Sequence, residues 1–297
     1  MPGPVGYEKL TAFRDRISFS AAAAGIIALF GFLIYSNTFQ NQFLFDDLRN
    51  IRDNPSIRDL KLFLDPQVIF KPRGLVNLTF ALNYAAGGIH VFGYHLVNTV
   101  IHILNGIVVF FLSRLLFSAA RQKSINGRPS GDGEVLWMSF FAALFFLAHP
   151  VQTQAVTYIV QRYASMAALF YLLACLFYVK GRMARQSGPE VKRKRPASPG
   201  KGGPVFGRGL PFFALAALCA PLAYLCKQNA ASLPAALLLI EVLFLRGKKR
   251  FRAGDLLVPA VVAVLWALFI LAVQLVGTGS LFSPDLLEDV SRMTVET

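Results

Sequence analysis

Long apolar runs separated by short polar segments dominate the chain. Most of these runs approach the ~20 residues that a helix needs to cross the ~30 Å hydrocarbon core of a membrane. The pattern predicts an all-α, polytopic helical membrane protein with about seven spans, because every backbone polar group in lipid must be satisfied within a helix. The spans expected are residues 18–37, 94–116, 134–148, 163–179, 210–226, 230–245 and 256–277, of which 134–148 is short for a full crossing.

The longest polar interruption, residues 38–93, is too long for a structureless connection in a compact protein. Within it, "LVNLTFALNYAAGG" places leucines at helical spacing and ends in a glycine pair that supplies a stop. We therefore predict that this large first outer loop contains an amphipathic helix, lying at the membrane interface with its apolar face toward lipid.

Composition agrees with this organisation. Hydrophobic residues make up 55% of the chain and charged residues 15%, with a mean hydropathy of +0.51. Soluble domains carry about a quarter charged residues, so a large soluble core is excluded. The three cysteines, Cys175, Cys219 and Cys226, lie in or beside the apolar runs without CxxC spacing. We interpret them as small packing residues and predict no metal site from ligand spacing.

The formal net charge of +14 is unevenly placed along the chain. With alternating spans, 21 of the 30 Lys and Arg residues fall on the side of the N-terminus. The positive-inside rule then makes that side cytoplasmic and segment 38–93 extracytoplasmic. The charge is thus a topology signal, and we predict no nucleic-acid partner. Three parts follow: a cytoplasmic N-terminus 1–17, a transmembrane domain 18–277 with a basic cytoplasmic linker 180–209, and an outer C-terminal segment 278–297.

Two adjacent carboxylates, Asp46 and Asp47, follow directly after the first apolar run. The simplest interpretation is that charges resume where water resumes. The functional interpretation is that one of them is a general base that takes a proton from a hydroxyl group. Neighbouring carboxylates cannot both lose protons freely. We assign Asp46 as the base and Asp47 as its support.

Two cations, Arg162 and Lys227, fall on the same outer side as these carboxylates. The planar fork of arginine suits phosphate, although an arginine at this boundary can also reach toward lipid headgroups. Cations near the lipid surface can stabilise a phosphate as it leaves. Together with a base, they predict glycosyl transfer from a polyprenyl-phosphate-linked sugar to an acceptor hydroxyl.

Polar residues also occur inside the predicted spans, where they are costly and point to a site by default. His95, Asn98, His102 and Asn105 share one face of a helix. We interpret the inner pair, His102 and Asn105, as interhelical hydrogen-bond donors and acceptors. For His95 and Asn98 the same role and a cavity wall are equally open. Further cavity-lining candidates are His149, at the break before Pro150, and Gln154.

Four segments carry a family resemblance: "FDDLRNIRDNPSIRDL", "VNLTFALNYAAGGIHVFGYHLVNTVIHILNG", "LAHPVQTQAVTYIVQRYASMAALFYLL" and "KQNAASLPAALLLIEVLF". They cover most of residues 43–245, and the chain resembles the integral-membrane GT-C glycosyltransferases. It is most similar to the transmembrane-plus-TPR relatives of protein O-mannosyltransferases, of bacterial type. The resemblance implies a GT-C-like fold, a catalytic carboxylate at Asp46 or Asp47, and a polyprenyl-phosphate sugar donor, mannose in the eukaryotic enzymes.

The chain departs from that family in three places. It reads Lys227-Gln228-Asn229 where relatives often read Lys-Glu-Asn, and Arg73-Gly74-Leu75 where they often read Arg-Pro-Leu. Relatives continue through more membrane helices and TPR repeats, whereas this chain ends at "VSRMTVET". We include Arg73 with Arg162 and Lys227 as donor phosphate-binding candidates, and Gln228 and Asn229 as cavity-lining candidates.

The expected partners are a polyprenyl-phosphate sugar, an acceptor protein or glycan, and membrane lipid. No cofactor is predicted beyond the lipid-linked donor, the need for a divalent metal stays open, and the expected location is a bacterial inner membrane. The alternative is a non-catalytic membrane scaffold derived from such an enzyme, consistent with Gln228 and the missing C-terminal part. Secondary transport is weaker, because the sequence shows no paired broken helices, and Glu241 lies near the inner end of its span.

Overall fold

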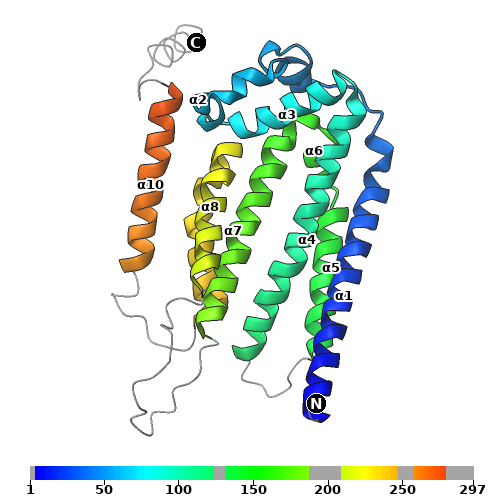
Figure 1. The fold of residues 1–297 in the computed structure, drawn as a ribbon, viewed down its shortest axis with the longest axis vertical. Coiled ribbons are helices and arrows are strands. Elements are labelled where there is room, and N and C mark those ends of the chain that lie inside the picture. The colour runs from blue at the N-terminus through cyan, green and yellow to red at the C-terminus, as the bar shows by residue number, and fades with distance from the viewer. Residues whose placement is uncertain (1–3, 124–130, 187–208, 247–256, 279–297) are drawn as a thin grey trace, which may run out of the picture.

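The structure is a computed structural model that describes residues 4–123, 131–186, 209–246 and 257–278. In these ranges the regular elements are all helical, and the long helices stand side by side as a bundle (Figure 1). The all-α membrane fold predicted from the apolar pattern is confirmed. The bundle consists of α1 (Pro4–Tyr35), α4 (Val91–Lys123), α5 (Asp132–Ala148), α7 (Arg162–Gln186), α8 (Leu210–Cys226), α9 (Leu233–Ile240) with the π-helix η8 (Glu241–Leu245), and α10 (Leu257–Thr278).

Each predicted span coincides with one of these helical segments. Within the described residues, four stretches are long and apolar enough to cross a membrane: Phe19–Thr38, Val91–Arg121, Ile159–Arg185 and Gln228–Leu245. Helices α5 and α8 have 17 residues each, and the apolar stretch described in α10 is Val264–Gln274. The number of crossings therefore stays a prediction. Helix α1 already begins at Pro4, so the first apolar run is the second part of a longer helix.

Connecting segments 39–90, 149–161 and 227–232 meet at one end of the bundle, which we call the loop end. Figure 1 shows α2, α3 and α6 there, opposite the N-terminus. The first of these segments is folded throughout, as its length predicted. Its elements are η2 (Leu48–Arg52), η3 (Pro55–Ile57), η4 (Leu60–Leu64), α2 (Pro66–Phe70) and α3 (Gly74–Gly87), and the 3-10 turn η1 (Ser36–Thr38) precedes them.

The amphipathic helix predicted in this loop is α3, and it ends as expected. Gly88 has a φ of 61°, a conformation that glycine adopts without strain, and its N–H donates to the carbonyl of Tyr84. The apolar face, however, contacts protein and not lipid. Val76 and Phe80 are fully buried in a cluster with residues of α4 and α7. The helix therefore closes the loop end of the bundle, because the tops of α4 and α7 present Tyr94 and Tyr163 to it.

The start of α3 depends on a glycine. A Cβ atom on Gly74 would lie 2.2 Å from the carbonyl oxygen of Val68 and 2.5 Å from that of Ile69. The preceding residue, Arg73, has a left-handed φ of 68°, and its N–H donates to the carbonyl of Leu225 at 2.8 Å. This tight turn docks the first outer loop onto the end of α8.

Within the bundle, the inner polar pair of α4 joins helices, as predicted. The His102 Nε2 atom donates to the carbonyl of Leu147 at 3.3 Å, and the Asn105 side chain donates to the carbonyl of Ser165 at 2.9 Å. The three cysteines are free and buried, which agrees with a packing role. Most of linker 180–209 and nearly all of the C-terminal segment 278–297 lie outside the described residues.

Candidate functional site

The candidate site is organised by six consecutive residues, Tyr158–Tyr163, which we call the junction segment. It begins with Tyr158, directly after the short helix α6 (Gln152–Thr157), and continues through the 3-10 turn η5 (Ile159–Gln161) into the start of α7. His149 adopts an extended backbone after α5, as Pro150 requires of the residue before it. The chain thus turns at the loop end and enters the bundle again through the junction segment.

Asp47 is anchored to the junction segment and is almost fully buried. Its Oδ1 atom accepts from the Val160 N–H at 2.7 Å, and its Oδ2 atom accepts from the Leu44 N–H at 3.2 Å. Burial raises the pKa of this carboxyl group, which the two hydrogen bonds oppose and the charge of Asp46 reinforces to a small extent. Asp47 therefore ties the first outer loop to the start of α7.

Asp46 has a different environment, because its side chain is exposed. Its backbone N–H donates to the hydroxyl oxygen of Tyr158 at 3.0 Å, and its carbonyl accepts from the Asn50 side chain at 2.8 Å. The two adjacent carboxylates thus separate into a buried one held by backbone N–H groups and an accessible one. This arrangement is the one expected if Asp46 is the base and Asp47 its support. The catalytic assignment itself stays a prediction.

Arg162 is fully buried at the centre of the loop end. Its guanidinium donates through Nε to Asn98 Oδ1 at 2.7 Å and through Nη2 to the carbonyl of Tyr94 at 3.0 Å. The Nη1 atom donates to Asn83 Oδ1 at 2.6 Å and to both oxygens of Thr79. The charge lies 4.4 Å from the centre of the Phe80 ring, a cation–π contact. The guanidinium nitrogens therefore donate to oxygen atoms of the protein. The contact between Arg162 and a donor phosphate stays a prediction.

The other two predicted cations, Arg73 and Lys227, lie beside each other in the fold. The backbone of Arg73 is bonded to Leu225, two residues before Lys227. The Arg73 guanidinium lies 5.0 Å from the centre of the Tyr163 ring, and Lys227 Nζ lies 3.5 Å from Gln161 Oε1. Arg73 is exposed and Lys227 is half-buried. Both cations therefore contact the junction segment and face neutral groups.

The outer polar pair of α4 is buried and supports the same region. The Asn98 side chain donates to the carbonyls of Val156 and Ile159, at 3.3 and 3.1 Å, while it accepts from Arg162. His95 Nε2 donates to the carbonyl of Asn41 at 2.9 Å. The sequence left two roles open for His95 and Asn98, and the contacts described here fit the first of them, hydrogen bonding between segments. A cavity wall stays a prediction.

The remaining cavity-lining candidates lie around the rim. Gln154, Gln228 and Asn229 are exposed, and His149 is half-buried against the ring of Phe145. The structure places them at the loop end with Asp46, but no hydrogen bond joins them to Asp46 or Asp47 within the described residues. His149 Nδ1 instead accepts from the Val151 N–H at 3.3 Å.

Several residues of this network escaped the sequence analysis. Tyr158 contacts Asp46, and Tyr163 donates to Asn77 Oδ1 at 2.6 Å. Thr79 and Asn83 solvate the Arg162 guanidinium. A usable signal was present, because Asn77 and Asn83 interrupt the apolar pattern of α3 and the junction segment carries two tyrosines beside a buried-helix arginine.

The charged side chains of the candidate site differ from a neighbouring pair in that they form no ion pairs. Among the described residues, Asp46, Asp47, Arg73 and Lys227 form no ion pair with one another or with any other group, whereas Arg52 and Asp53 nearby do pair, at 2.8 Å. Carboxylates and cations are therefore held at one end of the bundle, on one segment, without neutralising each other. Within the same residues no group of three or more His, Cys, Asp or Glu gathers in a way that could hold a metal ion.

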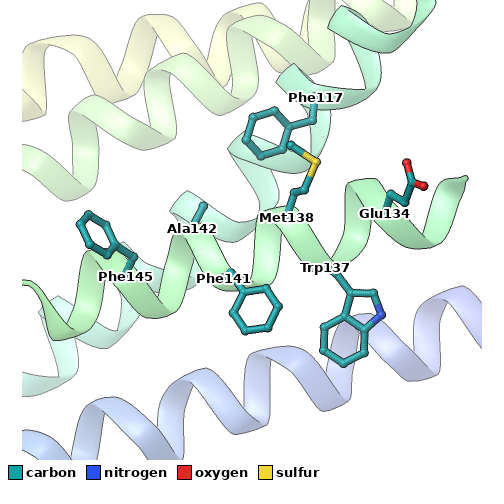
Figure 2. Close-up of a pocket in the computed structure, with 7 residues that line it drawn as sticks. All are labelled: Phe117, Glu134, Trp137, Met138, Phe141, Ala142 and Phe145. Atoms are coloured by element: carbon teal, nitrogen blue, oxygen red, sulfur yellow. The ribbon is translucent and has the colours of Figure 1, made fainter. Parts of the chain in front are cut away.

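An apolar groove lies elsewhere, on the outward face of α5 (Figure 2). Trp137 and Phe145 are 51% and 69% exposed along it. Its position on the flank of the bundle suits lipid chains, and it holds none of the candidate catalytic groups. The groove is lined by Phe117, Glu134, Trp137, Met138, Phe141, Ala142 and Phe145.

Comparison with known proteins gives relatives of one kind. The chain is 32% identical to "Protein O-mannosyl-transferase Tmtc3" of Drosophila melanogaster over 157 residues, which is 47% of this chain and 17% of the relative. It is 34% identical to Tmtc1 of the same organism over 167 residues, or 52% and 18% of the two chains. It is 32% identical to human TMTC2 over 160 residues, or 48% and 17%.

The match spans less than a fifth of the length of each of these relatives. No protein-family model matches the chain. No solved structure matches it either. The chain therefore has relatives among glycosyltransferases that are named as protein O-mannosyl-transferases, and the resemblance inferred from the motifs is confirmed at that level.

Proposed function

We propose that this chain carries the catalytic region of a glycosyltransferase of the GT-C type. It transfers a sugar from a polyprenyl-phosphate carrier to a hydroxyl group of a protein acceptor. The names of the relatives support mannose as the sugar and a protein as the acceptor. The helical membrane fold supports a donor that reaches the site through lipid.

The observation that carries the proposal is the separation of unpaired charges at the loop end. Asp46 is exposed and bonded to Tyr158, while Arg73 and Lys227 contact Tyr163 and Gln161 of the same segment. An accessible carboxylate can accept a proton, and two cations held nearby can bind a phosphate. If Asp46, Arg73 and Lys227 were held in ion pairs, their charges would be less available to a substrate.

In the proposed reaction, Asp46 takes the proton of the acceptor hydroxyl as its oxygen forms a bond to the anomeric carbon of the sugar. The bond between that carbon and the phosphate oxygen breaks, and the electron pair leaves with the polyprenyl phosphate. Arg73 and Lys227 stabilise the phosphate as it leaves. Arg162 keeps the junction segment in place through its contacts with α3 and α4, and its guanidinium does not need to touch the donor.

We further propose that the loop end faces the extracytoplasmic side and that the N-terminus is cytoplasmic, in a bacterial inner membrane. The distribution of Lys and Arg supports this orientation. A protein acceptor then arrives from outside, at the side where Asp46 is exposed.

The test is to replace Asp46 by Asn in the full chain and to measure sugar transfer from polyprenyl-phosphate mannose in membrane vesicles. Loss of a general base lowers turnover by about 10²–10⁴-fold, while insertion and expression stay unchanged. The matched control is Asp53→Asn, which changes another exposed aspartate of the same loop that is paired with Arg52. Wild-type turnover in Asp46→Asn rules out the proposed base.

A second candidate is a non-catalytic scaffold derived from such an enzyme. It is favoured by Gln228, which stands where relatives often carry a glutamate and is exposed at the loop end. In that case the wild-type chain inserts stably and turns over no polyprenyl-phosphate sugar. Sugar transfer by the wild-type chain overturns this candidate, and a gain of activity in Gln228→Glu over an inactive wild type supports it.

A further inference from the structure

The turn that presents Asp46 is conformationally strained. Phe45, directly before it, has a φ of 46° and an 82% exposed side chain. A bulky residue in the left-handed region carries a steric cost. No apolar contact repays this cost, because the phenyl ring lies in the open. The conformation therefore depends on hydrogen bonds made by its neighbours.

Two sets of hydrogen bonds hold the turn. Inside it, the Asp47 N–H donates to the carbonyl of Leu44 at 2.9 Å, and the Leu48 N–H donates to the carbonyl of Phe45 at 3.1 Å. From outside, Val160 holds Asp47 and Tyr158 holds Asp46. Asp46 is therefore held on both sides of its backbone, by the Asn50 side chain from the same loop and by Tyr158 from the junction segment.

Tyr158 is itself in a fixed position. The carbonyls of Val156 and Ile159, on either side of it, both accept from the buried Asn98 side chain. Its own carbonyl accepts from the Gln161 N–H at 3.0 Å. The phenol therefore extends from a backbone that α4 holds on both sides, and its hydroxyl can impose a position on Asp46.

We propose that Tyr158 is a positioning residue for Asp46, holding the backbone and the carboxylate of the base toward the arriving acceptor hydroxyl. This inference rests on the proposed function. Tyr158 takes no part in the bonds that form and break in the proposed reaction, and its role is to position Asp46. The hydroxyl accepts from the Asp46 N–H, so its own proton is not used in that bond and can be donated to the Asp46 carboxylate.

The protonation state of the phenol agrees with this role. Partial burial raises the pKa of Tyr158, and the negative charges of Asp46 and Asp47 add to the rise. The hydroxyl therefore keeps its proton at neutral pH and remains a hydrogen-bond donor.

The test is Tyr158→Phe, which keeps the ring and removes only the hydroxyl. We expect kcat to fall about tenfold, the loss that corresponds to one hydrogen bond, with KM for the polyprenyl-phosphate donor unchanged. The amide of Asp46 should also exchange with deuterium about tenfold faster, because its acceptor is gone. A peptide covering 74–87 should exchange as in the wild type.

The matched control is Tyr171→Phe on α7, which removes a hydroxyl that lies 3.3 Å from Ser232 Oγ. It should change neither kcat nor the exchange at Asp46. A general loss of packing in Tyr158→Phe would instead raise exchange across the 74–87 peptide and lower the amount of folded protein, and this outcome overturns the positioning role.

Asp46→Asn, measured in parallel, separates the two proposals. If Asp46→Asn is inactive while Tyr158→Phe keeps the wild-type kcat, the positioning role is wrong and the proposed function stands. If Asp46→Asn is fully active, Asp46 is not the base, and the positioning role of Tyr158 falls with that assignment. If the wild-type chain transfers no sugar, the proposed function itself is wrong. Unchanged exchange at Asp46 in Tyr158→Phe overturns the positioning role whether or not turnover is measured.

Discussion

The buried and half-buried charges at the two ends of the helical bundle have different partners. At the end that carries the N-terminus, Glu241 of η8 accepts from Arg182 Nε at 2.7 Å and from the Tyr178 hydroxyl at 2.9 Å. Asp132 pairs with Arg121 at 2.6 Å. At the loop end, Arg162 is surrounded by neutral oxygens instead.

This difference separates structural charges from available ones. A carboxylate that already binds a guanidinium has little affinity left for a ligand, whereas Asp46, Arg73 and Lys227 pair with nothing among the described residues. Amide and carbonyl oxygens solvate Arg162 without cancelling its charge. The loop end therefore keeps a positive field around a site that would receive a phosphate.

The largest expected effect is on Arg162. In Arg162→Lys, one ammonium group replaces a planar fork whose nitrogens reach Asn98, Asn83 and Tyr94 on two helices. We expect a loss of about 3–5 kcal/mol, the cost of leaving buried groups of a charged network unpaired.

Thermal unfolding in detergent measures this loss, and Arg49→Lys, an exposed arginine of the same loop end, is the control. A melting temperature equal to that of the wild type would mean that Arg162 does not hold the loop end together. Its predicted contact with the donor phosphate would then become the better explanation.

A smaller effect is expected at the opposite end. Glu241→Gln removes the charge that pairs with Arg182, where the two side chains are 20% and 28% exposed. We expect a loss of about 1–3 kcal/mol, because a charged hydrogen-bond partner is lost in a half-buried site. Turnover per folded molecule should be unchanged, since the pair lies at the other end from the proposed catalytic groups.

Asp132→Asn provides the matched control, because its pair with Arg121 is more exposed and should be worth no more than about 1 kcal/mol. A fall in turnover per folded Glu241→Gln molecule would contradict the division between a structural end and a functional end.

The sequence predicted the helices and the end at which the candidates meet. Hydrophobic runs specify helices because lipid allows few alternatives, and alternation of spans places Asp46, Arg162 and Lys227 on one side. The stop of α3 at Gly88 and the break at Pro150 follow from local backbone rules.

The individual contacts could not be predicted in this way. Arg162 meets Asn83 and Asn98 from helices 79 and 64 residues away in sequence, and helical periodicity does not specify which helix faces which. The requirement for Gly74 arises from its contact with the backbone of Val68, which depends on the path of the loop. The direction of the α3 apolar face was wrong for the same reason, since protein rather than lipid lies beneath it.

The smallest expected effect sharpens the contrast between the two carboxylates at the loop end. Burial raises the pKa of Asp47 in the folded chain, so the folded state binds its proton more tightly than the unfolded state. The resulting stabilisation is fully present below the ordinary aspartate pKa of about 3.9 and is lost as the pH rises through the raised folded value. Hydrogen bonds from Val160 and Leu44 to the carboxylate oppose the shift and keep the effect small.

Asp47→Asn does not titrate, so the melting temperature of the wild type minus that of Asp47→Asn should increase as the pH falls from neutral toward 4. Asp46→Asn is the control, because that side chain is exposed. A difference that shrinks at low pH would mean that the ionised form of Asp47 is the favoured one in the fold. In that case the hydrogen bonds from Val160 and Leu44 outweigh burial, and Asp47 is a second charged carboxylate beside the base.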